Sequence, residues 1–126
     1  MNWLDRRIAA AGPHLALALT ADEFAAACRH IKIEVPTDAM KTGHAHATTW
    51  FFDHPNGADF VAIVALASTE GRDPIEVAGL LVHEAVHVWQ RYRDWIGESR
   101  PGVEQEAYGI QAIAQELLAE FARRVE

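Results

Sequence analysis

The chain has 126 residues, half of them hydrophobic and under a quarter charged, which suits one globular domain with its own core and excludes a disordered chain. Its formal net charge of -7 argues against nucleic-acid binding, because non-specific binding needs a basic surface. Cys28 is the single cysteine, so we expect a small buried side chain and no internal disulfide. No apolar run approaches the roughly 18 residues of a membrane span, and a Gly-Pro pair interrupts the apolar N-terminal stretch, so we expect a cytoplasmic protein without membrane contact.

The first third of the chain predicts helices. A short apolar face over residues 4–11 ends at the Gly-Pro pair, which breaks a helix. A second helix is expected to begin at Thr20, because Thr20 and Glu23 have the spacing of a capping box. Apolar side chains at helical spacing follow, up to Ile31.

The middle third predicts strands. Apolar and charged residues alternate over 31–35, and aromatic and β-branched residues fill 48–52. A turn signal at 54–57, His-Pro-Asn-Gly, separates that segment from the apolar run Phe60–Leu66. The two runs on either side of the turn predict an antiparallel hairpin.

The last third predicts two long helices. Asp73 and Pro74 are the residue types favoured at an N-cap and at the first helical position, and Gly97 is a suitable end. The second of these helices is expected over residues 101–124, with an apolar stripe in alternating steps of three and four residues. The stripe consists of Val103, Ala107, Ile110, Ala114, Leu117 and Phe121. The sequence therefore predicts a single α+β domain over residues 1–126, with N-terminal helices, a small antiparallel sheet and two long helices.

Residues 83–87 read His-Glu-Ala-Val-His, and this motif carries the chemical signal of the chain. Residues four apart lie on one face of a helix, so both imidazoles can bind one zinc ion. Glu84 lies about 100° around the helix from His83, where it can reach a water at an open position of the metal. Zinc would lower the pKa of that water, and Glu84 would act as the general base in an attack on a carbonyl group.

The specificity of this motif can be weighed against chance. Random placement of the histidines and glutamates of the chain gives the pattern with a probability of about 3%. The motif also lies in a predicted helix among uncharged neighbours, where unpaired polar groups are costly. The competing interpretation is a pair of structural histidines that are hydrogen-bonded to backbone groups.

The motif and a downstream helix containing Glu-x-x-Ala resemble the gluzincins, the thermolysin-like branch of the zinc metallopeptidases. The resemblance covers roughly residues 74–125, the two long helices that the sequence predicts. It implies a zincin-like fold and a zinc ion bound by His83, His87 and Glu104, with Glu84 as the catalytic base. The family has Asp where this chain has Tyr108. A phenol is a poorer acceptor for a ligand histidine, so Tyr108 is instead a candidate for stabilising the oxyanion.

The third ligand has an alternative in Glu106, and helix geometry limits both carboxylates. If the motif helix continued to Gly97, His87 would lie about 15 Å from its end at 1.5 Å per residue. Strictly antiparallel packing would then leave Glu104 too far from the histidines. We therefore expect either an earlier helix end, at 91–94, or a steep crossing of the two helices. In a third interpretation both carboxylates are solvated, and they lie at the start of the helix only because the helix dipole favours negative charge there.

Other residues have several interpretations. His44 and His46 would share one face of a strand, as a second metal site, a substrate contact or a solvent-facing pair. His54 belongs to the predicted turn. The resemblance also implies that the strand before the motif helix, Phe60–Leu66, lines the cleft and pairs with an extended peptide. An ordinary core strand is the alternative.

Together these features predict a zinc-dependent metallopeptidase that hydrolyses a peptide or protein, similar to small zincin-like proteins of bacteria and phages. The alternative is a zinc-binding module that keeps the fold without turnover, because the chain is short for a peptidase. In that case zinc contributes to folding. A third interpretation is a metal-free interaction domain that presents Trp89, Trp95, Leu117 and Phe121.

Overall fold

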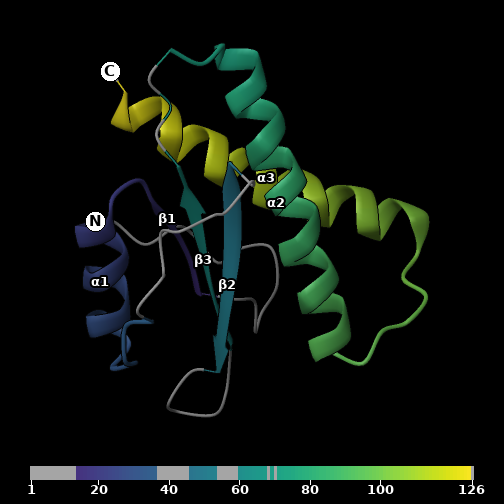
Figure 1. Ribbon diagram of the computed structural model, residues 1–126. Coiled ribbons are helices and arrows are strands. Elements are labelled where there is room, and N and C mark those ends of the chain that lie inside the picture. Colours follow the sequence, from purple (N-terminus) through teal and green to yellow (C-terminus); the bar gives the residue numbers. More distant parts are fainter. Residues whose placement is uncertain (1–13, 37–45, 54–59, 68, 70, 126) are drawn as a thin grey trace.

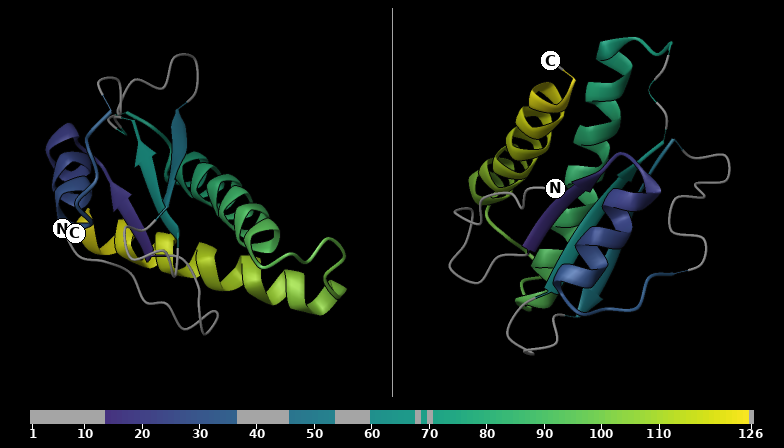
Figure 2. Two further views of the ribbon diagram at one scale, coloured as in Figure 1. Left: turned by 90° about the horizontal axis from the view of Figure 1, so that it is seen from below. Right: turned by 90° about the vertical axis from the view of Figure 1, so that its left-hand side faces the viewer.

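A computed structural model describes residues 14–36, 46–53, 60–67, 69 and 71–125 of the chain. These residues form a mixed α+β structure in three layers (Figures 1 and 2). Helix α1 covers one face of a small sheet, and α2 and α3 together cover the other face. The elements in chain order are β1 (His14–Ala18), α1 (Ala21–His30), β2 (Ala47–Asp53), β3 (Phe60–Leu66), α2 (Pro74–Trp95) and α3 (Val103–Arg124).

Strand β3 is the central strand of the sheet, which has the order β1-β3-β2. It pairs antiparallel with β2, so the predicted hairpin strands are confirmed. All seven residues of β3 are buried, because successive side chains enter different cores. Phe60 and its alternate neighbours face α2 and α3, whereas Val61 and its alternate neighbours face α1. The expectation that β3 pairs with a peptide is wrong, because both of its edges are already hydrogen-bonded to strands.

The sheet is mixed and not purely antiparallel, because β1 pairs in parallel with β3. The prediction that the whole first third is helical is therefore wrong at His14–Ala18. Leu15 and Leu17 enter the core beneath α2 and α3, and the alternating Ala16 and Ala18 enter the core beneath α1. Alanine and leucine favour helices, but burial on both faces of the sheet outweighs that weak preference. The helix expected over 4–11 lies outside the described residues.

The strand expected over 31–35 is also wrong, because these residues end α1. Helix α1 begins as predicted, with the Thr20 hydroxyl accepting a hydrogen bond from the Glu23 amide at 3.1 Å. At its other end Lys32 has a φ of 60°, and the Ile33 amide donates to the Cys28 carbonyl at 2.9 Å. This left-handed helix end returns Ile33 to the core, which explains the alternation that resembled a strand.

Helix α2 has the ends that the sequence predicts. Asp73 is the N-cap, and its carboxylate accepts a hydrogen bond from the Ile75 amide at 2.8 Å. Pro74 occupies the first helical position, and the helix continues to Trp95 before Gly97 adopts a φ of 75°. The motif helix therefore does not end early.

Helix α3 crosses α2 obliquely, and its first turns extend past the sheet (Figures 1 and 2). For this reason Val103, at the start of the predicted apolar stripe, is 83% exposed, while Leu117 is fully buried. Gly109 of α3 faces the ring of Trp89 on α2. A methyl group at Gly109 would overlap the Trp89 ring.

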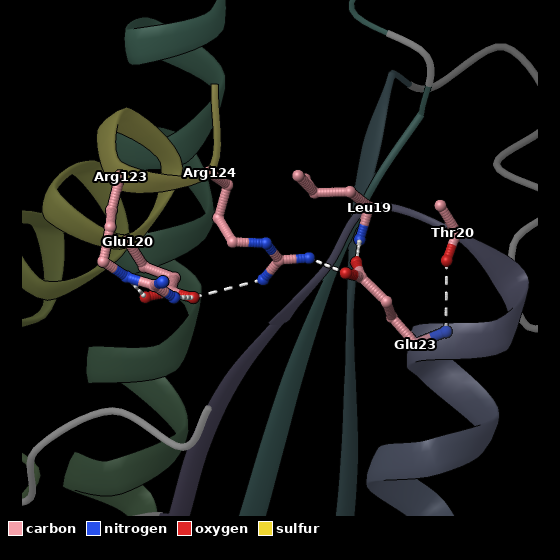
Figure 3. Close-up of polar contacts among 6 residues, drawn as sticks. All are labelled: Leu19, Thr20, Glu23, Glu120, Arg123 and Arg124. Carbon is pink, nitrogen blue, oxygen red and sulfur yellow. Dashed lines mark hydrogen bonds and ion pairs between the residues drawn. The ribbon is translucent and has the colours of Figure 1, made fainter. Parts of the chain in front are cut away.

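Four charged residues connect α1 with the end of α3 (Figure 3), and we call them the ion cluster: Glu23, Glu120, Arg123 and Arg124. Arg124 forms ion pairs with both glutamates, and Arg123 forms a second pair with Glu120. Glu120 is almost completely buried. The other Glu23 oxygen accepts a hydrogen bond from the Leu19 amide at 2.7 Å.

Cys28 is buried in the core beneath α1, as predicted. Its burial raises the pKa of the thiol, and the neighbouring Arg29 opposes this shift to a lesser extent. None of the described helices combines the length and apolar character that a membrane span requires.

Candidate metal centre

The two histidines of the motif lie one turn apart on the exposed side of α2. Leu81, Ala85 and Val88 on the opposite side are completely buried in the core, which fixes the rotation of the helix. The His83 side chain is 66% exposed as a result. The core-facing residues of α2 therefore determine that the two imidazoles are accessible to a ligand from solvent.

The two imidazole rings converge on one point. Their Nε2 atoms lie 3.2 Å apart, with the ring centroids separated by 4.8 Å. Two nitrogens that bind one tetrahedral zinc ion at 2.0–2.1 Å would lie about 3.3–3.4 Å apart. The separation of the Nε2 atoms of His83 and His87 therefore fits two ligands of a single ion.

Gln90 determines which nitrogen of His87 is available. The Gln90 Oε1 atom lies 3.1 Å from His87 Nδ1, and an amide oxygen can only accept a hydrogen bond. In the neutral imidazole Nδ1 then carries the proton, and the lone pair of Nε2 is directed toward His83. This is the arrangement by which metal-binding histidines are usually oriented.

Glu84 faces inward, between α2 and the edge strand β2. It is 5% exposed, and its Oε1 atom accepts a hydrogen bond from the Thr49 hydroxyl at 2.7 Å. The second carboxylate oxygen, Oε2, lies 3.9 Å from His83 Nε2. Glu84 is therefore beside the histidine pair, at a distance that suits contact through one water.

Among the described residues, neither carboxylate expected on α3 lies with the two histidines as a third ligand. Glu104 is exposed at the start of α3. Glu106 accepts a hydrogen bond from Trp89 Nε1 at 3.1 Å and lies 3.8 Å from the Arg93 guanidinium. Within the described part of the chain, no three His, Cys, Asp or Glu side chains form a group that could hold a metal.

The register of the two helices explains where these carboxylates lie. Because Gly109 faces Trp89 and the helices run in opposite directions, residues before Gly109 lie beside the last turns of α2. The contact of Glu106 with Arg93 agrees with this register. Tyr108, the candidate for the oxyanion, is 66% exposed on the same projecting part of α3.

Two cavities flank the histidine pair. The first cavity, of about 410 Å³, adjoins His87 and is lined by residues of β2 and α2: Thr48, Thr49, Phe51, Glu84, His87, Gln90, Arg91 and Asp94. The second cavity, of about 470 Å³, adjoins His83 and is lined by His46, Arg72, Glu76, Gly79, Leu80 and His83. The histidines thus lie between two spaces of the size that small ligands or side chains occupy.

His46 is the second of the two histidines expected near a strand, and it lies just before β2. Its carbonyl accepts a hydrogen bond from the Ala67 amide at 2.9 Å, which extends the pairing of the sheet by one residue. Its ring nitrogen Nδ1 contacts the Arg72 guanidinium. His44 and His54 lie outside the described residues.

Sequence reasoning missed the roles of Thr49, Gln90 and Arg72. Gln90 follows His87 by three residues, so helical spacing alone could have indicated that contact. The partners Thr49–Glu84 and Arg72–His46 are 35 and 26 residues apart in sequence, and no local pattern connects them.

Comparison of the chain with protein-family models, with curated proteins and with solved structures gives no match.

Proposed function

We propose that the protein is a zinc-dependent metallopeptidase of zincin-like fold, in which His83 and His87 hold the metal. The observation that supports this most strongly is the convergence of the two Nε2 atoms to 3.2 Å, with Gln90 orienting one ring. A pair of structural histidines would be expected inside the core, bonded to backbone groups. Here His83 and His87 are both exposed and directed at each other.

Glu84 is the proposed general base. A bound zinc ion would supply Lewis acidity and would lower the pKa of a water in its coordination sphere. Thr49 holds one oxygen of the Glu84 carboxylate, so the other oxygen, Oε2, remains on the side of His83 and can accept a proton there. Burial of Glu84 keeps bulk water from competing for that proton.

The proposed substrate is an extended peptide that lies along β2. Strand β2 is an edge strand in the described sheet, so its outer backbone groups are available to a further strand. Thr49 and Phe51 of this strand line the first cavity beside His87. A peptide paired with β2 would therefore pass the histidine pair, which is the role that the family resemblance implied for Phe60–Leu66.

The alternative proposal is a zinc-binding module without peptidase activity, and the position of the α3 carboxylates favours it. Catalytic zinc sites usually have three protein ligands, and Glu104, which the family pattern predicts, is not beside His83 and His87. Two imidazoles alone would bind zinc more weakly. Weak zinc binding would be expected under both proposals, so the zinc affinity does not separate them. The effect of a substitution at Glu84 on peptide hydrolysis does.

The deciding experiment measures zinc content and peptide hydrolysis together. Protein purified without chelators is expected to hold about one zinc per chain, because the two histidines fit one ion, and His83→Ala is expected to lose it. Glu84→Gln should keep the zinc and the fold, because the glutamine oxygen can still accept the Thr49 hydrogen bond. It should nevertheless lose hydrolysis of a peptide library, since the amide cannot accept the proton.

Each outcome has a defined meaning. Zinc in the wild type with equal hydrolysis by Glu84→Gln contradicts the assignment of Glu84 as base. Zinc without hydrolysis in any form supports the non-catalytic module. A protein that takes up no zinc when the ion is added contradicts both proposals.

A further inference from the structure

The second cavity combines a fixed positive charge with direct access to the proposed metal ligands. His83 belongs to its lining, and Arg72 and His46 line it as well. Arg72 is partly buried just before the N-cap of α2. Its backbone amide donates to the Thr69 carbonyl at 3.0 Å, which fixes the position from which its side chain extends.

The contact between Arg72 and His46 selects one tautomer of the neutral imidazole. A guanidinium group only donates hydrogen bonds, so His46 Nδ1 must act as the acceptor. In the neutral ring the proton is then on Nε2, which makes that atom a donor and unsuitable as a metal ligand. Of the roles considered for His46, a contact to substrate therefore fits better than a second metal site.

The positive charge of Arg72 is not neutralised by a carboxylate in the described structure. Among the described residues, the ion pairs of arginine side chains involve Arg93, Arg123 and Arg124, and the partner of Arg72 is the imidazole of His46. Glu76 lines the same cavity and would repel an anion placed close to it, so an anion should bind at the Arg72 end. The Arg72 guanidinium and the Nε2–H group of His46 are therefore left as donor groups for an anionic acceptor at this end of the cavity.

We infer that the second cavity is a substrate subsite, in which Arg72 and His46 bind a carboxylate of the peptide beside the bond to be cleaved. The inference rests on the proposed peptidase function, since it takes the ligand to be a peptide that passes His83. A carboxylate fits because guanidinium groups bind it through paired, charge-assisted hydrogen bonds. The carboxylate belongs either to an acidic side chain or to the C-terminus of the peptide, and the two sources are separable by experiment.

The test measures peptide binding to the zinc-loaded Glu84→Gln protein, which prevents turnover. The probes are fluorescent alanine-rich hexapeptides with one glutamate at each position in turn, matched peptides with glutamine there, and both sets with free or amidated C-termini. Neutralising the bound carboxylate is expected to weaken binding about tenfold or more, the usual effect of a charge-assisted hydrogen bond. Weaker binding of the glutamine peptides than of the glutamate peptides would show that the bound carboxylate is an acidic side chain. Weaker binding of the amidated peptides would show that it is the C-terminus.

Arg72→Gln is the variant that tests the assignment, with Arg100→Gln as the matched control at an exposed position outside both cavities. The carboxylate preference should disappear in Arg72→Gln and persist in Arg100→Gln. Equal binding of charged and neutral peptides by the wild-type cavity overturns the inference. So does a preference that survives Arg72→Gln, or the absence of binding by any acidic peptide at millimolar concentration.

The same titrations without zinc, taken with the zinc content and hydrolysis of the wild type, separate this inference from the peptidase proposal. If the carboxylate preference depends on Arg72 while the wild type neither takes up zinc nor hydrolyses peptides, the carboxylate site is supported and the peptidase is contradicted. Zinc-dependent hydrolysis without a carboxylate preference would support the peptidase and contradict the subsite.

Discussion

At the scale of single residues, the histidine pair depends on a neighbour that is not itself a candidate ligand. Gln90 holds His87 at Nδ1, on the side of the ring opposite to the proposed metal position. A ring without that hydrogen bond would rotate and would divide its proton between two nitrogens, and both effects oppose metal binding. The zinc affinity should therefore depend on Gln90 as well as on the ligands.

Gln90→Ala is expected to weaken zinc binding about 10- to 100-fold, the usual effect of removing the group that orients a ligand histidine. Gln90→Glu should retain the affinity or raise it, because a carboxylate is a stronger acceptor for Nδ1. Competition with a chromogenic chelator measures both values. Unchanged affinity in Gln90→Ala would show that this hydrogen bond does not orient the ligand.

The sequence predicted some residue roles and not others. The spacing of His83, Glu84 and His87 within one helix required no tertiary information, and the structure has all three on α2 as expected. The assignments of Glu104 and Tyr108 depended on how α3 would lie against α2. In that geometry Gly109 faces Trp89, a tertiary contact that the residue pattern does not reveal.

At the scale of elements, the contact between α2 and α3 decides what lies near the motif. Gly109 lets the α3 backbone approach the face of the Trp89 ring, and the Trp89 indole then donates to Glu106. This hydrogen bond and the nearby Arg93 keep Glu106 beside the second half of α2. The site therefore depends on the helix pair as a unit.

Gly109→Ala is expected to destabilise the protein by about 1–3 kcal/mol, because the added methyl group overlaps the Trp89 ring in a packed interface. The matched control is Gly79→Ala on α2, where a methyl group would meet no atom within 4 Å. That change should stabilise the protein by about 0.5–1 kcal/mol through helix propensity alone. Unfolding in urea gives both values, and a stabilising Gly109→Ala would contradict the proposed close approach.

Elements whose signals were local were predictable, and elements defined by distant partners were not. Strand β3 and helix α2 have clear boundaries in the sequence, and both were found at the expected places. Strand β1 has a leucine–alanine sequence that by itself favours a helix, and its pairing with β3 overrides that preference. Residues 31–35 alternate like a strand because they follow the end of α1, where Ile31 and Ile33 pack into the core beneath that helix.

At the scale of the whole molecule, the ion cluster joins the two helical layers across the sheet (Figure 3). Glu23 belongs to α1 and Arg124 to the end of α3, so their ion pair connects residues that are distant in sequence. Glu120 is buried, and its charge is balanced by both arginines. Loss of one partner would leave a charge that is largely removed from water, which is costly.

A double-mutant cycle with Glu23→Gln and Arg124→Met measures this connection. We expect a coupling free energy of about 1–2 kcal/mol, because the two side chains are largely buried and share an ion pair. Arg123 would still balance Glu120 in both variants, so the fold should survive. Strictly additive effects would show that the two layers are energetically independent at this position.

The burial of β3 on both faces has a consequence for how the protein behaves once it unfolds. Once β1 or β2 separates, seven consecutive apolar residues without charge or proline become available to other chains. Segments of this kind assemble into intermolecular β-structure, so heated protein is expected to precipitate before it can refold. A thermal scan would then report the rate at which folded protein is lost to aggregation, and not an equilibrium melting temperature. Urea at low protein concentration keeps the unfolded chains apart. Protein that has been heated through its transition once is expected to show little zinc uptake afterwards.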